Sequence, residues 1–117
     1  MESLPITVVE MPEFLAKARK LMDEEAKSLL INFVARNPES GDLISGTGGV
    51  RKLRWALEGR GKSGGARVIY YFHNASIPLF VITAYAKNQQ ANISDEDRNG
   101  FRRLTRALVE NYGKREP

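Results

Sequence analysis

Two nearly continuous apolar runs constrain the fold of this chain more than any other feature of its sequence. Arg67–His73 and Leu79–Tyr85 each have the length of one strand, and the turn-forming segment Asn74–Pro78 separates them. A short run that is apolar at almost every position is typical of a central strand with both faces at least partly covered. The two runs therefore predict a hairpin in the middle of a sheet.

The segments around this hairpin predict two more strands and three helices. Val50–Leu57 has strand character and would form an antiparallel meander with the hairpin, while the β-branched run Ile6–Glu10 would add a strand at an edge. Helices are predicted from Glu13 to about Lys20, from the N-cap Asp23 to Asn37-Pro38, and from the N-cap Ser94 through Phe101, Leu104, Leu108 and Tyr112. Residues 38–49 are predicted to be a loop. The order β-α-α-β-β-β-α predicts an α+β fold, with a small, mainly antiparallel sheet and helices packed on one face.

Length and composition limit the classes of protein to which the chain can belong. A chain of 117 residues is expected to form one domain, residues 1–117. It has no apolar run near the roughly 18 residues of a transmembrane helix, and its N-terminal segment does not resemble a secretory signal. It also contains no cysteine. We therefore expect a cytoplasmic protein with no membrane partner.

Positive charge is concentrated in the second part of the chain. Residues 1–42 carry five Lys or Arg and eight Asp or Glu, whereas residues 43–117 carry thirteen and six. The segment Gly46–Phe72 contains one carboxylate, Glu58, and the cations Arg51, Lys52, Arg54, Arg60, Lys62 and Arg67. A basic cluster on a small sheet predicts a polyanionic ligand, with RNA as the first candidate. The alternative is ordinary solvation of the surface.

Strand periodicity indicates which of these cations can act together. Lys52 and Arg54 share one face of their predicted strand, while Arg51 shares the other face with Leu53 and Trp55. Arg67 opens the next strand, so Lys52, Arg54 and Arg67 would present three cations to one or two phosphates. The competing interpretation is that they only solvate an exposed sheet face.

Tyr85, Lys87 and Asn88 form a second candidate group at the end of the last predicted strand. An aromatic ring there can stack on a base, and a lysine can donate to a phosphate, although core packing of Tyr85 remains an equal alternative. His73 is the only histidine and is expected to be structural or exposed. No residues have metal-ligand spacing, so no metal is expected. The last predicted helix carries a further basic stripe: Arg98, Arg102, Arg103 and Arg106. This stripe either contacts an acidic partner or nucleic acid, or it is a solvated face.

Residues 37–88 contain several short motifs that together are specific. They are Asn37-Pro38, Gly41-Asp42, Gly46-Thr-Gly-Gly-Val-Arg-Lys-Leu-Arg54, Gly61-Lys62, Gly64-Gly65, Arg67-Val-Ile-Tyr-Tyr-Phe72 and Tyr85-Ala-Lys-Asn88. This pattern resembles the HigB branch of the RelE/ParE superfamily, toxins of bacterial type II toxin–antitoxin systems. The resemblance implies a RelE-like fold and an mRNA interferase, a ribosome-dependent endoribonuclease that cuts mRNA in the A site of the 70S ribosome. It also implies inhibition of translation, neutralisation by a cognate antitoxin, and no cofactor.

The resemblance also implies roles for individual residues. In such a nuclease the ribose 2′-hydroxyl attacks the adjacent phosphate, which requires a base, an acid and cations that stabilise the phosphorane. Lys52 and Arg54 match two basic family positions that act as base or charge stabiliser, and Arg67 matches the arginine that stabilises the phosphorane. Lys87 lies near the family position that donates a proton or holds phosphate.

One position departs from the family pattern. Some RelE members use a tyrosine of the final helix as the base, where this chain has Phe101. Tyr85 or a lysine would then be the base, and the assignment stays open. RNA binding is expected of three other basic residues of the cluster and of the asparagine after the last predicted strand: Arg51, Arg60, Lys62 and Asn88.

Two other functions remain open from the sequence. The first is a ParE-like inhibitor of DNA gyrase on the same fold, which would not need clustered cations at Lys52, Arg54 and Arg67. The second is a non-catalytic RNA- or ribosome-binding module, which would use the basic face without cutting RNA.

Overall fold

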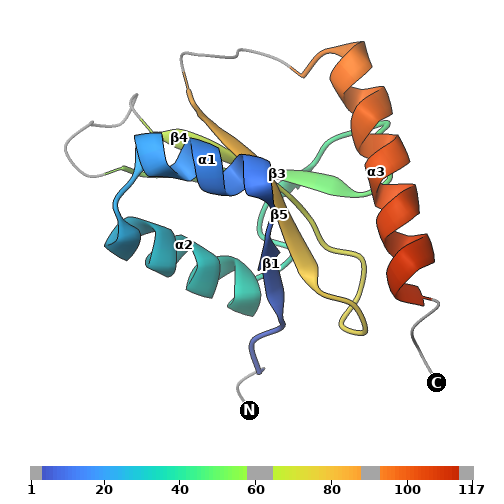
Figure 1. The fold of residues 1–117 in the computed structure, drawn as a ribbon, viewed down its shortest axis with the longest axis horizontal. Coiled ribbons are helices and arrows are strands. Elements are labelled where there is room, and N and C mark those ends of the chain that lie inside the picture. Colours follow the sequence, from blue (N-terminus) through green and yellow to red (C-terminus); the bar gives the residue numbers. More distant parts are fainter. Residues whose placement is uncertain (1–3, 58–64, 88–92, 114–117) are drawn as a thin grey trace.

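The structure is an α+β arrangement of three helices and one mixed sheet, as the sequence predicts (Figure 1). The computed structural model describes residues 4–57, 65–87 and 93–113. Its elements are β1 (Val8–Glu10), α1 (Pro12–Leu21), α2 (Glu24–Arg36), β2 (Asp42–Leu43), β3 (Val50–Trp55), β4 (Ala66–Tyr71), β5 (Leu79–Ala86) and α3 (Asp95–Gly113). Among these described residues, no helix has the length and apolar character needed to cross a membrane.

The five strands lie in the order β1-β5-β4-β3-β2. The predicted hairpin is confirmed as β4 and β5, which occupy the second and third places of the sheet and pair antiparallel. The predicted edge strand is confirmed as β1, which runs parallel to β5. β2 is an addition, because the segment 38–49 was expected to be a loop throughout. It has only two residues, too few for any periodicity to reveal it in the sequence.

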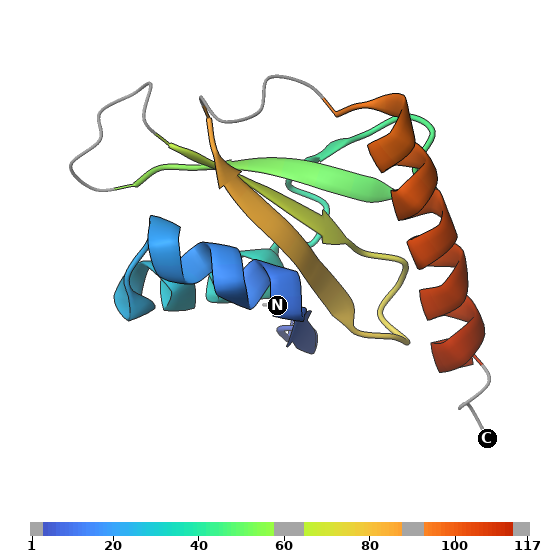
Figure 2. The ribbon, with the colours of Figure 1, turned by 45° about the horizontal axis from the view of Figure 1, so that its top comes forward.

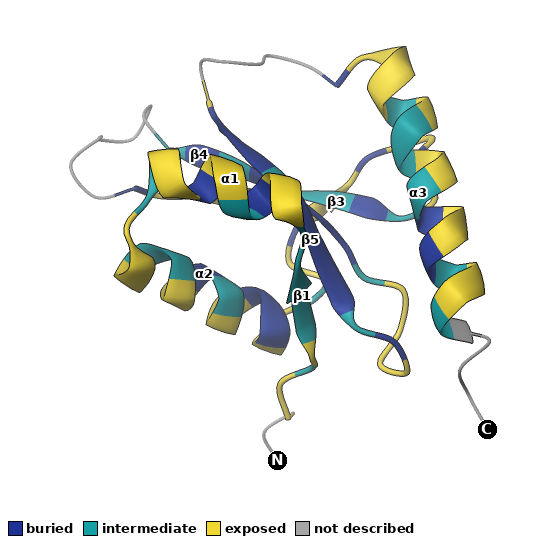
Figure 3. Cartoon of the chain, in the orientation of Figure 1, coloured by how far each residue is buried: buried dark blue, intermediate teal, exposed yellow. Residues whose placement is uncertain are grey.

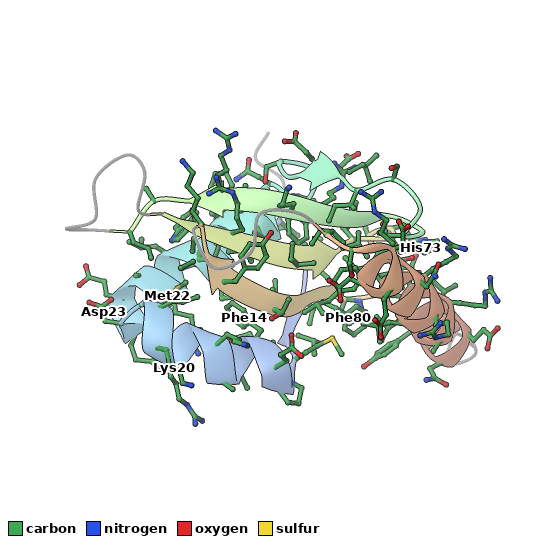
Figure 4. The ribbon with its side chains drawn as sticks, turned by 90° about the horizontal axis from the view of Figure 1, so that it is seen from above. Phe14, Lys20, Met22, Asp23, His73 and Phe80 are labelled. Carbon is green, nitrogen blue, oxygen red and sulfur yellow. The ribbon has the colours of Figure 1, made fainter. Side chains whose placement is uncertain are left out.

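Helices cover both faces of the sheet, so the prediction that they pack on one face is wrong. Alternate residues of β4 belong to two separate apolar clusters: Val68 and Tyr70 pack with α1 and α2, whereas Ile69 and Tyr71 pack with α3. Figure 2 shows α1 and α2 together and α3 apart from them. In Figure 4, Phe14 marks the first cluster and Phe80 the second.

The correction has a clear physical reason. Almost every residue of β4 and β5 is buried, so β5 is dark along most of its length in Figure 3. An apolar strand face that is left in water is unfavourable, so a strand that is apolar on both faces needs cover on each of them. The apolar runs that predicted central strands therefore also required cover on the second face, and α3 provides it.

Capping side chains mark the starts of α2 and α3, as predicted. The Asp23 carboxylate accepts a hydrogen bond from the Ala26 N–H at 2.8 Å, and α2 ends at Arg36, directly before Asn37-Pro38. The Ser94 hydroxyl accepts from the Asp97 N–H at 3.0 Å at the start of α3. The predicted inner face of α3 is also confirmed, since the second cluster includes Phe101, Leu104, Leu108 and Tyr112.

Two side chains of the sheet hold the first half of the loop before β3. The Tyr70 hydroxyl donates to the Pro38 carbonyl and accepts from the Gly41 N–H, both at 2.8 Å. The Arg51 guanidinium donates to the carbonyls of Glu39 and Gly41 at 3.1 and 2.8 Å. The family motifs at Asn37-Pro38 and Gly41-Asp42 therefore have a structural role here, because they shape the chain that leads into β2.

The second half of this loop docks against α3. Thr47 is fully buried, its hydroxyl donates to the Ile44 carbonyl at 2.6 Å, and its carbonyl accepts from the Thr105 hydroxyl at 3.2 Å. Gly48 has a φ of 81°, and a Cβ at this position would lie 2.6 Å from the Thr105 oxygen. The Gly46–Gly49 motif thus allows the loop to approach the helix closely.

Candidate nucleic-acid interface

The sheet register places two of the predicted catalytic arginines opposite each other. Arg54 of β3 and Arg67 of β4 are paired residues, and Arg67 is in turn paired with Tyr85 of β5. Side chains of directly paired residues point to the same face, with Cβ atoms about 4.5–5.5 Å apart. Arg54, Arg67 and Tyr85 therefore form one row across three neighbouring strands, which we call the Arg54–Tyr85 row.

Lys52 lies on the same face, one step along β3 from this row. It pairs with Ile69. Like Val50 and Tyr85, Ile69 belongs to the apolar cluster that packs against α3. The predicted shared face of Lys52 and Arg54 is thus confirmed, and Arg67 joins them there. Asp42 of β2 pairs with Lys52, so one carboxylate borders the cations at the edge of the sheet.

The three cations are available to an anion. Arg54 is exposed and Lys52 and Arg67 are half-buried. Within residues 4–57, 65–87 and 93–113, none of them has a carboxylate partner within ion-pair distance. The one hydrogen bond of the Arg67 guanidinium in this part of the chain is long, 3.4 Å to the Ala66 carbonyl. Like charges on adjacent strands repel, so a bound phosphate would relieve this repulsion as well as gain attraction.

Tyr85 is both a core residue and a wall of a pocket. Only 8% of its surface is exposed, and its ring packs in the cluster under α3. It also lines a hollow of about 460 Å³ between β5 and the first turns of α3. Burial raises the pKa of Tyr85 above its ordinary value, and the positive charge of Arg67 only partly opposes this shift. Tyr85 therefore keeps its phenolic proton at neutral pH.

Lys87 extends the same face beyond the row. Its N–H donates to the Gly65 carbonyl at 3.0 Å, so the pairing of β4 and β5 continues past Ala86. Because Lys87 follows Tyr85 by two residues, its exposed side chain lies on the side of the sheet that carries the row.

The structure does not bring Arg51 to this face. Its guanidinium holds the loop before β2 and lies 3.8 Å from the Glu39 carboxylate, on the α2 side of the sheet. The predicted RNA-binding residues Arg60, Lys62 and Asn88 lie outside the described residues.

The basic stripe of α3 divides into two pairs. Arg98 donates to the carbonyl and hydroxyl of Ser45 at 2.9 and 3.0 Å, and Arg102 donates to the Gly46 carbonyl at 3.0 Å, so these two hold the loop. Arg103 and Arg106 are exposed. His73 lies beyond the far end of β4 from Arg67 (labelled in Figure 4), where its Nδ1 is 3.1 Å from the Tyr71 hydroxyl.

Sequence reasoning missed the helical wall of the pocket beside Tyr85. Glu96, Gly100 and Arg103 of α3 line it together with Thr83 of β5. Their spacing of three and four residues places them on one side of a helix, and that spacing was the available signal.

Comparison with known protein families gives a match over most of the chain. The family described as the RelE toxin of the RelE / RelB toxin–antitoxin system matches residues 13–115. The matched region runs from α1 to the end of α3 and contains every residue of the Arg54–Tyr85 row.

Proposed function

Since the chain belongs to the RelE toxin family of toxin–antitoxin systems, we propose that it is a ribosome-dependent endoribonuclease that cuts mRNA in the A site. The observation that carries the proposal is the Arg54–Tyr85 row with Lys52 beside it, three cations on one face without a carboxylate partner in the described residues. The motifs between Asn37 and Asn88 support a place in the HigB branch. The site of action would be the cytoplasm, where ribosomes translate.

The row suits the transition state of attack by a 2′-hydroxyl. As the 2′-oxygen bonds to phosphorus, negative charge accumulates on the non-bridging oxygens before the 5′-oxygen leaves. Arg67 lies in the middle of the row, between Arg54 and Tyr85, and a guanidinium can donate to two phosphate oxygens at once. Fixed donors that gain strength as charge develops are the largest single source of catalysis in such sites.

Proton transfer is proposed to involve the lysines on either side of the row. Burial raises the pKa of Tyr85, so its hydroxyl stays neutral and is proposed to hydrogen-bond to the phosphate, while the base for the 2′-hydroxyl is proposed among the lysines. Lys52 and Lys87 lie on the same face of the sheet, from β3 and from the end of β5. They are therefore the two proposed proton carriers, and the cyclic phosphate and free 5′-hydroxyl follow as products.

Primer extension on an mRNA in a purified translation system tests the proposal. Wild type and Arg67→Ala are compared with and without ribosomes, with Arg19→Ala as a matched control, since Arg19 is exposed on α1. We expect cuts within codons that need both ribosomes and Arg67 and that persist in Arg19→Ala. Intact mRNA in every lane would refute the proposal. DNA damage in induced cells would then indicate gyrase inhibition, and ribosome binding without cuts would indicate a binding module.

A further inference from the structure

The hollow beside Tyr85 continues the Arg54–Tyr85 row toward α3. Its floor includes Ile69 of β4 with Thr83 and Tyr85 of β5, and Tyr85 pairs with Arg67. Because adjacent strands lie about 4.8 Å apart, the hollow begins one strand away from Arg67. A nucleotide whose phosphate lies at Arg67 can therefore reach the hollow with its base. The volume of about 460 Å³ is that of a small-molecule site, roughly 300–1,000 Å³.

Gly100 forms part of the helical wall of this hollow, although neither backbone conformation nor packing requires a glycine there. It lies in the interior of α3, where glycine weakens a helix relative to alanine. It is not among the described glycines that have a positive φ. A Cβ at this position would meet no atom within 4 Å. The missing side chain therefore preserves one thing, which is open space in the hollow.

The neighbours of Gly100 on this wall carry opposite charges. Glu96 lies one turn before it and Arg103 one turn after it, and all three line the hollow. Both charged side chains are exposed, and within residues 4–57, 65–87 and 93–113 neither forms an ion pair. A carboxylate accepts hydrogen bonds from an amino group, and a guanidinium donates to a ring nitrogen or a carbonyl. Together they match the polar edge of a nucleobase.

The other charges around the hollow favour a neutral base over a second phosphate. Carboxylates outnumber cations among the side chains that line it: Glu13, Glu96 and Asp97 against Lys17 and Arg103. An anion would therefore be repelled here, in contrast to the neighbouring Arg54–Tyr85 row. The floor supplies the apolar surface on which the faces of a base can pack.

We propose that this hollow holds one base of the RNA beside the cut, and that Glu96 selects a base with an exocyclic amino group. Adenine, cytosine and guanine each carry such a group, whereas uracil does not. The carbonyl oxygens of uracil would face the Glu96 carboxylate and leave it without a donor, which is unfavourable. Gly100 leaves the space that the base occupies. The inference rests on the proposed function, because it names the feature of the substrate that the same site recognises.

Primer extension in the purified translation system tests the selection of the base. The probes are mRNAs that differ at a single codon, with each of the four bases placed at each codon position in turn. At one position we expect wild type to cut about tenfold more slowly with uracil than with the other bases. Glu96→Gln adds a donor to the acceptor and should reduce this difference to about twofold. Asp95→Asn is the matched control, since it removes a carboxylate from the same turn of α3 outside the hollow, and it should retain the wild-type preference.

Filling the hollow tests its use as a binding site. Gly100→Leu should slow cleavage of every codon about tenfold or more while the midpoint of unfolding stays equal or rises. Asn99→Leu places the same side chain at the exposed neighbouring position and should leave cleavage unchanged.

Three results would overturn the inference and leave the proposed function intact: wild-type cleavage that is insensitive to the base, an unchanged preference in Glu96→Gln, or full activity of a folded Gly100→Leu. The Glu96→Gln result decides the matter if Gly100→Leu does not fold. Intact mRNA with wild type would refute the proposed function and this inference with it.

Discussion

The contact between Gly48 and Thr105 predicts that Gly48→Ala strongly destabilises the protein. Gly48 has a φ of 81°, and this left-handed conformation costs an alanine about 1–2 kcal/mol. The new Cβ would lie 2.6 Å from the Thr105 oxygen, so the hydrogen bond from Thr105 to Thr47 would be lost, at about 0.5–1.5 kcal/mol. The free energy of unfolding should therefore fall by about 1.5–3.5 kcal/mol.

Two glycine controls separate the contributions. Gly46 has a φ of 77°, but the nearest atom to its added Cβ is the end of the Arg102 side chain at 3.7 Å. Gly46→Ala should thus cost only the backbone term of about 1–2 kcal/mol. Gly100 lies in α3, and a Cβ there would meet no atom within 4 Å. Gly100→Ala should therefore stabilise the protein by about 0.5–1 kcal/mol.

Equilibrium denaturation in urea measures all three variants, and thermal unfolding should show a drop of about 10 °C for Gly48→Ala. A change smaller than that of Gly46→Ala would refute the claim that close contact with Thr105, beyond the backbone conformation, requires glycine at position 48.

The remaining predictions concern charge and pH. Arg54→Ala should lower affinity for a single-stranded RNA oligonucleotide and reduce the slope of log K against log salt by about 0.7, as expected for one lost phosphate contact. Arg36→Ala, at the end of α2, should leave that slope unchanged, and an unchanged slope in Arg54→Ala would exclude phosphate contact. Burial raises the pKa of both Tyr71 and Tyr85, so each favours the folded state while protonated. This stability is complete below the ordinary tyrosine pKa of about 10 and is lost as the pH rises through the higher folded-state pKa. The free energy of unfolding should therefore fall above about pH 10, and Tyr85→Phe should weaken this dependence in denaturation at a series of alkaline pH values.

Local rules of the sequence predicted the faces of the strands well. The two-residue period of a strand separated Lys52 and Arg54 from Arg51, and the structure confirms this separation. Capping side chains likewise predicted where α2 and α3 begin. Strand periodicity and helix capping depend on residues only a few positions apart, so both can be predicted from the sequence alone.

Contacts between distant segments could not be predicted in this way. The pairing of Arg54 with Arg67 depends on the register of two strands whose connecting residues carry no signal for it, and a slip by one residue would move Arg67 to the other face. The close contact of Thr47 with Thr105 joins residues 58 positions apart. The purpose of the Gly46–Gly49 motif is therefore visible only once α3 lies against it.

The sequence by itself determined the order of helices and strands, the central hairpin and the concentration of positive charge near Lys52, Arg54 and Arg67. Tertiary structure alone decided that α3 covers the second face, that Tyr85 completes a row with two arginines, and that Phe33 of α2 packs against Trp55 of β3. The physical reason is the distance along the chain over which each effect acts. Periodicity and capping act over a few residues, whereas burial of both sheet faces and strand register are set by packing across the whole molecule.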